Sequence, residues 1–559
     1  MIRMFERHNI RKQREIGGCW KMCKLLNNGE ISESVTALVP SCWESMRGFE
    51  DFRGRCKYTK TIRTEASDIR INFKGVSHTA DVFFDGKWVA HHYNAYTEFD
   101  VIIEKVSAGE HVLEVIADNS FSSESTLHFA NDYKSYGGIT RPVVLEELCG
   151  AYIRFLHITP MKKESGWCAE VSVEINNINL DDNALNAIVK LNNETIEFHN
   201  SDFTDNVAKK CISFNDVEEW SLESPTLYIA RAELYCDGRI IDDLNERFGF
   251  REVKVDGNRI LLNGKQLFIK GFNRHEEYAT LGCSVPENVM SADLDMINDM
   301  GANLVRTSHY PNDERFLDLC DERGVLVWEE AHARQIFADR MSNPNFEQQA
   351  IDGIDEMILN HYNHPSIILW GALNECESFS EIGRAAHILH FNRIKKLDKT
   401  RPTTTAANKF FKDICHDLPD VLSFNFYPKW YYDHDPVEFL DKVKKYAEEL
   451  GAVNKPMLIS EFGAAAIYGY RSLSDVKWSE DRQAEIIGSL IDTFKEIDYL
   501  SGMIIWQFCD GRVDSEMKEF ATRPKTQNNK GVVDIYRRPK MSYYTVRENY
   551  RKIGNYIQD

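Results

Sequence analysis

Two short apolar runs, each ending in a glutamate, constrain the fold of this chain more than any other feature of its sequence. Residues 367–373 lead into Asn374-Glu375, and residues 456–460 lead into Glu461. Each run is bounded by turn-forming residues and is too short for a core helix, so we predict a buried strand at each position. Because a buried strand excludes charge, a glutamate at its C-terminal end indicates a functional site; the alternative is a strand cap or an ion-pair partner.

Strands and helices alternate in the sequence after about residue 255. The predicted strands are Leu267–Gly271, Ala302–Arg306, Val325–Glu329, Ile367–Leu373, Thr403–Ala407, Val421–Phe426, Met457–Glu461 and Met503–Phe508. The predicted helices are Asn312–Arg323, Gln348–Tyr362, Glu381–Leu397, Val437–Leu450 and Asp481–Ile497. This alternation of strands and helices over about 300 residues predicts a (β/α)8 TIM barrel, whose active site lies at the C-terminal ends of its strands. The two glutamates then face one pocket, which is the minimal machinery for cleaving a glycosidic bond.

Short runs of alternating polar and apolar residues fill the first 250 residues and predict antiparallel strands. Asp85-Gly86, between two such runs, is a signal for a tight hairpin. We predict one β-sandwich over residues 1–150 and an immunoglobulin-like sandwich over 151–252, ahead of the barrel at 253–559. No linker rich in Pro, Gly or Ser separates these domains, so we expect them to pack rigidly.

Charge and cysteine usage exclude several classes of function. The 559 residues carry a formal charge of −20 at pH 7, whereas nucleic acid requires a basic surface. An anionic substrate would therefore need its own cations in the pocket. The 13 cysteines are scattered without a C-x-x-C pair, which favours reduced thiols over disulfides or a zinc site. The charged N-terminus leads into no apolar segment and no stretch is long enough for a membrane helix, so we expect a soluble cytoplasmic protein.

Three further strand ends carry motifs that identify a family. Residues 271–276 (Gly-Phe-Asn-Arg-His-Glu) close the first predicted strand. Residues 303–311 close the second strand, and residues 321–329 lead through the third. Together with the two glutamate motifs, they resemble glycoside hydrolase family 2 over essentially the whole chain. The resemblance implies a jelly-roll domain, an immunoglobulin-like domain and a TIM barrel, in the order that the pattern gives. It also implies a homo-oligomer, a dimer or tetramer, and no metal or cofactor.

Within that family the chain is similar to the β-glucuronidases, whose hallmark Asn-x-Lys occurs here as Asn528-Asn529-Lys530. The resemblance implies that Asn528 and Lys530 bind the C6 carboxylate of a uronic acid, because a cation and an amide donor distinguish a uronate from a neutral hexose. The other matching residues are Asp132, His309, Asn374, Asn425, Tyr427, Trp430, Tyr431 and Trp506. For the aromatic residues among them, core or rim packing is the alternative. The substrate implied is a small-molecule β-glucuronide or a saccharide that ends in a uronic acid.

The mechanism that the family implies is retaining hydrolysis by double displacement. Glu461 attacks the anomeric carbon, and Glu375 acts first as the acid and then as the base. These roles require a raised pKa for Glu375, while hydrogen bonds and cations keep Glu461 ionised. We expect the two carboxyl groups to lie ~5–5.5 Å apart. Asn374 would hold the 2-hydroxyl of the sugar, and Tyr427 would support the nucleophile.

Some positions depart from the family pattern and leave alternatives open. Arg523 lies five residues before Asn528, so the identity of the arginine that usually precedes Asn-x-Lys is unsettled. Arg334 adds a cation near the sugar site, which keeps a β-galacturonidase, or an enzyme that accepts both epimers, beside the β-glucuronidase reading. A β-galactosidase and an inactive carbohydrate-binding protein are the further alternatives. His275 and His309 lack a third donor at ligand spacing, so we expect them to support the pocket floor by hydrogen bonds rather than bind a metal.

Overall fold

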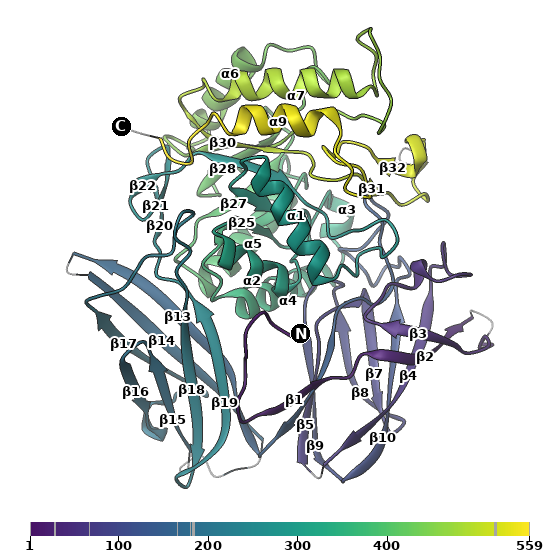
Figure 1. Ribbon diagram of the computed structural model, residues 1–559, viewed down its shortest axis with the longest axis vertical. Coiled ribbons are helices and arrows are strands. Elements are labelled where there is room, and N and C mark those ends of the chain that lie inside the picture. The colour runs from purple at the N-terminus through teal and green to yellow at the C-terminus, as the bar shows by residue number, and fades with distance from the viewer. Residues whose placement is uncertain are drawn as a thin grey trace.

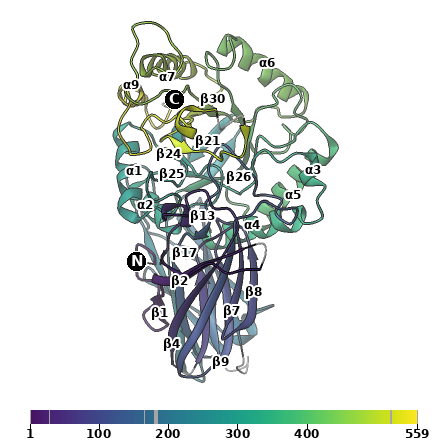
Figure 2. The ribbon, with the colours of Figure 1, turned by 90° about the vertical axis from the view of Figure 1, so that its right-hand side faces the viewer.

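The computed structural model describes residues 2–26, 29–65, 67–164, 166–178, 180, 185–518 and 522–557. Two β-sandwiches stand side by side and carry a barrel across one end (Figure 1). Turned by 90°, the molecule is elongated, with the barrel at one end and the sandwiches at the other (Figure 2). Among the described helices, none combines the length and the apolar character that a membrane crossing requires.

The first sandwich packs a four-stranded sheet against a six-stranded one. The four-stranded sheet has the order β1 (Lys12–Glu15), β12 (Val143–Leu148), β5 (Ser67–Phe73) and β9 (Phe99–Val106). The six-stranded sheet has the order β3 (Val35–Val39), β2 (Gly18–Leu25), β4 (Arg55–Thr64), β10 (Gly109–Asp118), β7 (Thr79–Phe84) and β8 (Lys87–Tyr93). Alternate residues of β10, such as Leu113 and Val115, are fully buried between the sheets. The predicted hairpin at Asp85-Gly86 is confirmed, since Phe84 pairs with Lys87.

The second sandwich has sheets of three and four strands, as in an immunoglobulin constant domain. The smaller sheet has the order β13 (Ala151–Lys163), β14 (Gly166–Asn177) and β17 (Val207–Phe214). The larger has the order β16 (Glu194–Phe198), β15 (Leu185–Leu191), β18 (Tyr228–Cys236) and β19 (Arg239–Phe248). Its core is separate from that of the first sandwich, so each sandwich has its own hydrophobic centre.

A closed parallel barrel follows, and the prediction of a TIM barrel is confirmed. Its strands are β23 (Ile269–Asn273), β24 (Leu304–Arg306), β25 (Leu326–Glu330), β26 (Ile367–Asn374), β27 (Thr403–Ala407), β28 (Val421–Asn425), β29 (Met457–Phe462) and β30 (Leu500–Ile505). The described helices are α1 (Glu287–Asp299), α2 (Glu314–Arg323), α3 (Ala338–Met341), α4 (Phe346–His361), α5 (Glu381–Leu397), α6 (Pro436–Glu449), α7 (Glu480–Phe494) and α9 (Met541–Tyr550). The eighth strand ends earlier than predicted, because Trp506 and Phe508 have left the barrel and lie in the loop beyond it.

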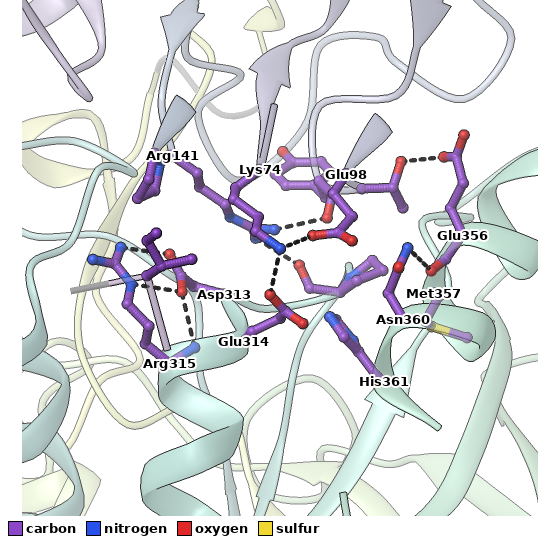
Figure 3. A pocket seen from close by; sticks show the side chains of 15 residues that line it. Lys74, Glu98, Arg141, Asp313, Glu314, Arg315, Glu356, Met357, Asn360 and His361 are labelled. Atoms are coloured by element: carbon purple, nitrogen blue, oxygen red, sulfur yellow. Dashed lines mark hydrogen bonds and ion pairs between the residues drawn. The ribbon is translucent and has the colours of Figure 1, made fainter. Parts of the chain in front are cut away.

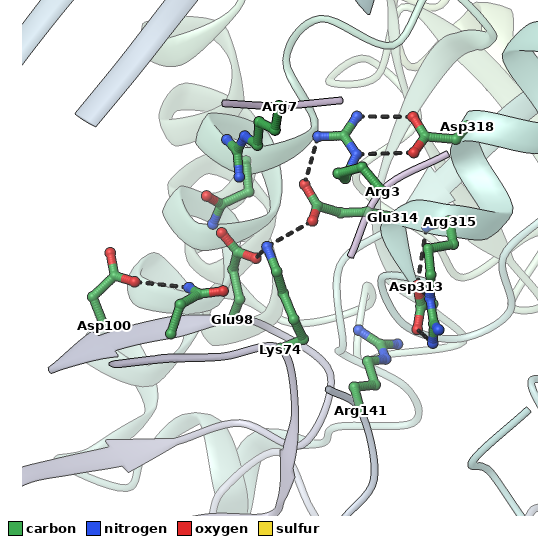
Figure 4. Close-up of polar contacts among 12 residues, drawn as sticks. Arg3, Arg7, Lys74, Glu98, Asp100, Arg141, Asp313, Glu314, Arg315 and Asp318 are labelled. Carbon is green, nitrogen blue, oxygen red and sulfur yellow. Dashed lines mark hydrogen bonds and ion pairs between the residues drawn. The ribbon is translucent and has the colours of Figure 1, made fainter. Parts of the chain in front are cut away.

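The segment before β1 passes between the two sandwiches and under the barrel (Figure 1). Its arginines bind acids from all three domains, in the pairs Arg3–Asp318 (2.8 Å), Arg7–Glu246 (2.8 Å), Arg11–Asp242 (2.7 Å) and Arg11–Glu146 (3.0 Å). Figure 4 shows the guanidinium of Arg3 bridging Asp318 and Glu314 on α2. The segment therefore ties the domains to one another.

Lys74 forms a second tie between the first sandwich and the barrel. It follows β5, is 8% exposed, and pairs with Glu98 of its own domain and with Glu314 of the barrel (2.7 Å to Glu314), as Figure 3 shows. The cavity beside it is about 10 Å³, the room that one water molecule occupies. Nearby, Arg141 donates to Glu276 (2.7 Å). These buried ion pairs hold the first sandwich at a fixed position on the barrel.

Replacement of Lys74 should weaken this interface strongly. Lys74→Met leaves the buried Glu98 without its paired cation and leaves Glu314 with Arg3 alone, which costs about 3–5 kcal/mol. The matched control is Lys442→Met, which removes an exposed ion pair with Glu438 and should leave the unfolding midpoint unchanged. Urea unfolding of both variants measures the difference. Equal midpoints for the two variants would contradict the assigned importance of Lys74.

Candidate active site

The guanidinium of Arg306, at the end of β24, lies at the centre of the site. It is fully buried and donates to Glu330 of β25 through Nε (2.7 Å) and Nη2 (2.9 Å). It also donates to Asn273 (2.8 Å), Asn374 (2.8 Å) and Glu461 (2.9 Å). Charge-assisted bonds of this kind are short and directional. Arg306 therefore fixes the C-terminal ends of β23, β25, β26 and β29 relative to one another.

Glu461, near the end of β29, is 4% exposed and held by two donors. Tyr427 donates its hydroxyl to Oε2 (2.7 Å), and Arg306 donates to Oε1. Burial raises the pKa of Glu461 to about 7, against the opposing effect of Arg306, and the charge of Glu375 adds to the rise. The carboxylate is thus the main form only above about pH 7. The sequence predicted that hydrogen bonds and cations keep Glu461 ionised. Burial raises its pKa more than these donors lower it, which explains the difference.

Glu375 follows the last residue of β26 and is half-buried. Gln335 donates to its Oε2 (2.9 Å), and Asn425 donates to its Oε1 (2.9 Å). Asn425 also donates to Asn374 (3.2 Å), the same side-chain oxygen that accepts from the central arginine. This chain of hydrogen bonds runs from Glu375 to Glu461, so the structure joins both predicted carboxylates in one hydrogen-bond network. Their separation of ~5–5.5 Å stays a prediction.

Asp132 reaches this site from the first sandwich, and a group of cations lies around its carboxylate. Its carboxylate pairs with Arg334 (2.7 Å) and Arg523 (3.3 Å) and accepts from Asn528 (3.3 Å). Burial would raise the pKa of Asp132, but Arg334, Arg523 and Lys530 outweigh it and lower the pKa to about 2. Three cations therefore act on this one carboxylate, and Arg334 also lies within the electrostatic reach of Glu375 and Glu461. Arg523 is therefore the arginine of this region that reaches the site.

Lys530, the third member of this group of cations, lies beside two predicted tyrosines. It is 6% exposed and donates to the hydroxyl of Tyr431 (2.9 Å). Its ammonium also lies 5.6 Å from the ring centre of Tyr427, the residue that donates to the nucleophile candidate. Trp430, by contrast, is buried in the hydrophobic core of the barrel and packs edge-on against Trp478. The hydroxyl of Tyr427 thus links the region around Lys530 to Glu461.

The pocket floor is aromatic. Trp506 stacks on His309, with ring centres 5.0 Å apart and an angle of 18° between the planes. His309 Nδ1 lies 2.9 Å from Glu330, and His275 Nδ1 lies 3.2 Å from the hydroxyl of Tyr310. Both histidines are buried and use these nitrogens to bind neighbouring side chains. Their positions agree with a supporting role in the floor.

The sequence did not assign a role to Arg306, Glu330 or Gln335. A signal for the first two was present, because each is a charged residue at the end of an apolar strand, as Glu375 is. Gln335 carries no such signal, since it lies in the loop after β25 and reaches Glu375 only through the fold.

Known proteins resemble this chain in sequence and in fold. The model for the TIM barrel domain of glycosyl hydrolases family 2 matches residues 253–555, and a further family 2 model matches residues 151–251. A solved β-galacturonidase of Eisenbergiella tayi is 45% identical, with 100% of both chains covered and a TM-score of 0.93. A β-glucuronidase of Streptococcus agalactiae is 25% identical over 97% of this chain and 96% of its own. The β-D-glucuronidase of Dictyoglomus thermophilum, 23% identical with 99% of both chains covered, has the same fold with a TM-score of 0.86.

The barrel model alone spans more than half of the 559 residues, and the E. tayi enzyme aligns from end to end. The resemblance read from the strand-end motifs is therefore confirmed: the chain belongs to glycosyl hydrolases family 2 and is a glycoside hydrolase.

Proposed function

We propose that this enzyme is a retaining exo-β-D-uronidase, which removes a terminal β-linked uronic acid. The observation that carries the proposal is the gathering of three cations, Arg334, Arg523 and Lys530, around Asp132, in a protein whose formal charge is −20. A pocket for a neutral hexose has no use for three buried or half-buried cations, whereas the carboxylate of a uronate balances them. The likeness to a β-galacturonidase and to β-glucuronidases supports the same substrate class.

In the first step Glu461 attacks the anomeric carbon and forms a covalent glycosyl ester, while the bond to the leaving-group oxygen breaks. Glu375 gives that oxygen its proton, so the leaving group departs neutral. Arg306 and Tyr427 each bind one oxygen of Glu461, which orients the carboxylate for attack. In the second step Glu375 takes a proton from water, and the resulting hydroxide displaces Glu461 from the anomeric carbon. Two inversions give net retention.

Asn374 is positioned to hold the 2-hydroxyl of the sugar. Its side-chain oxygen already accepts hydrogen bonds from Arg306 and Asn425, so its amide nitrogen is the atom that faces a ligand. A donor beside the reacting carbon strengthens its bond as charge develops in the transition state. Trp506, stacked on His309, offers the apolar face on which the sugar ring would rest.

The C6 carboxylate would bind to Lys530 and Asn528, with Arg523 adding charge. Lys530 already donates to Tyr431, and Asn528 already donates to Asp132, so both side chains are oriented before substrate binds. A lysine and an amide form the donor set that a carboxylate requires. Preorganised donors lose little side-chain entropy on binding.

The finer choice between epimers rests on Arg334. It pairs with Asp132 at 2.7 Å, so one carboxylate oxygen that would otherwise accept from a sugar hydroxyl is occupied by a cation. The two sugars differ only in the orientation of the 4-hydroxyl, and a changed donor set at that position changes which orientation binds. We propose β-D-galacturonides as the preferred substrates, in line with the 45% identity to the E. tayi enzyme. β-D-glucuronides, our first expectation from the sequence, are the second candidate and are supported by the S. agalactiae relative.

A panel of p-nitrophenyl glycosides tests the substrate class and the carboxylate site together. We expect turnover of the β-D-galacturonide above that of the β-D-glucuronide and almost none of the β-D-galactoside. Lys530→Met should lower kcat/KM for the uronides by about 100-fold or more, because a buried charge pair with the substrate is lost. Preferred turnover of the galactoside, unaffected by Lys530→Met, would overturn the proposal.

The acid limb of the pH profile should report Glu461. Because the nucleophile must be ionised, kcat/KM should fall about tenfold per pH unit below the pKa of about 7. Tyr427→Phe removes a hydrogen bond that lowers this pKa, so the limb should move to higher pH. The profile is measured on the preferred p-nitrophenyl uronide at substrate concentrations well below KM. An acid limb at the same pH in Tyr427→Phe and in the wild-type enzyme would contradict its assignment to Glu461.

Glu461→Gln should abolish nearly all turnover and yet stabilise the fold at neutral pH. The folded pKa of Glu461 is raised, so the stability that the protonated group contributes is present below its unfolded pKa of about 4.3 and is lost as pH rises to about 7. The glutamine variant avoids this loss, and its advantage should reach about 3 kcal/mol by pH 8. Urea unfolding of both proteins between pH 4.5 and 8 measures it. A constant difference across that range would show that burial does not raise this pKa.

A further inference from the structure

The leaving group of the reaction departs beside Glu375, and two loops flank this residue. On one side the backbone N–H of Glu375 donates to Ala406 of β27 (2.8 Å). On the other, the backbone N–H of Glu377 donates to Ile336 in the loop after β25 (2.9 Å). Residues that follow Ala406 and Ile336 therefore border the space next to the acid.

Lys409 extends from the first of these loops toward the second. It is half-buried, and its ammonium lies 5.8 Å from the ring centre of Phe337. Within the described part of the chain no acid pairs with this ammonium, whereas Arg306, Arg334 and Arg523 each pair with a carboxylate. A partly desolvated cation without a counter-charge is unfavourable unless a ligand supplies one.

Two neighbouring features point to the same space. The side-chain oxygen of Asn408 is buried and lacks a hydrogen-bond partner among the described residues. Aromatic rings are exposed on the loops that follow β25, β26 and β28: Phe337 (38%), Phe379 (42%) and Tyr432 (39%). Burial raises the pKa of Tyr432, and the charge of Glu375 adds to the rise, so this phenol lies within the electrostatic reach of the acid. Exposed rings suit a leaving group with a flat or apolar face.

We propose that Lys409, Phe337 and Asn408 form a leaving-group subsite that selects a ring carrying its own carboxylate. The proposal rests on the uronidase function. Lys409 supplies the counter-charge, and Phe337 supplies the stacking face. Asn408 contributes its buried side-chain oxygen as a hydrogen-bond acceptor. Because the protein as a whole carries −20, an acidic leaving group is repelled unless a local cation receives it. Uronic-acid oligosaccharides and conjugates of aromatic acids share this chemistry.

The test compares two leaving groups that differ in charge alone, 3-carboxyphenyl and 3-carbamoylphenyl, on the preferred β-D-uronide. The readout is the ratio of kcat/KM for the charged substrate to that for the neutral one, at low ionic strength. Lys409→Met should lower this ratio about fivefold to tenfold, and Lys409→Arg should keep it within about threefold of wild type. Small differences in leaving-group ability cancel, because they are the same for every variant.

Lys412 provides the matched control. It lies three residues further along the same loop and is exposed, so Lys412→Met removes an equal charge without touching the proposed subsite and should keep the wild-type ratio. A parallel comparison uses a disaccharide of two β-linked uronic acids and its C6 amide at the reducing-end sugar. Dependence on Lys409 for the disaccharide pair identifies a sugar acid as the natural leaving group, and dependence for the aryl pair alone identifies an aromatic acid.

A ratio that Lys409→Met leaves unchanged for both substrate pairs overturns the subsite, as does an equal fall in Lys412→Met. Failure of the proposed function gives a different result. In that case the wild-type enzyme releases neither the charged nor the neutral phenol from any uronide, while it hydrolyses the neutral hexosides.

Discussion

The site depends on one buried guanidinium. Arg306 emerges from β24 and binds side chains from four other strands of the barrel. A buried charge is tolerated only when each of its donors has a partner, so the strand ends that supply those partners are held in one arrangement. The nucleophile candidate Glu461 is one of the partners, and Asn374, next to the acid, is another. The guanidinium thus fixes the positions of the nucleophile candidate and of the residue next to the acid candidate.

The substrate pocket also needs a contribution from outside the barrel. Asp132 belongs to the first sandwich, yet it pairs with Arg334 and Arg523 of the barrel domain. The sandwich must therefore sit at a fixed position, and the buried ties through Lys74 and Arg141 provide that position. The first sandwich acts as a wall of the pocket rather than as a separate module, which agrees with the absence of a flexible linker in the sequence.

The sequence predicted the barrel well because most of its parallel strands are short apolar runs that alternate with helices. The fifth strand, Thr403–Ala407, contains three threonines and yet agrees residue for residue. The prediction placed the eighth strand too late, since Trp506 and Phe508 are as apolar as strand residues although they lie in the loop beyond β30. The two catalytic candidates were predicted because they are charged residues at the ends of apolar strands, whereas Asn528 and Lys530 were predicted only from the family resemblance. Arg523 could not be placed by spacing, because the left-handed residues Lys525 and Thr526 fold the chain back before Asn528. The raised pKa of Glu461 was beyond prediction, since burial is a property of the whole fold.

The arginine segment at the start of the chain has a consequence for biosynthesis. Arg3, Arg7 and Arg11 leave the ribosome first, but their acidic partners Asp242, Glu246 and Asp318 emerge more than 200 residues later. Domains fold as they are synthesised, so the first sandwich can complete its core while Glu146 is the only one of the segment's acidic partners that has been made. Asp242 and Glu246 arrive with β19 of the second sandwich, and Asp318 arrives with the barrel. The segment is therefore made first, but it completes its contacts only after both sandwiches and part of the barrel have been made.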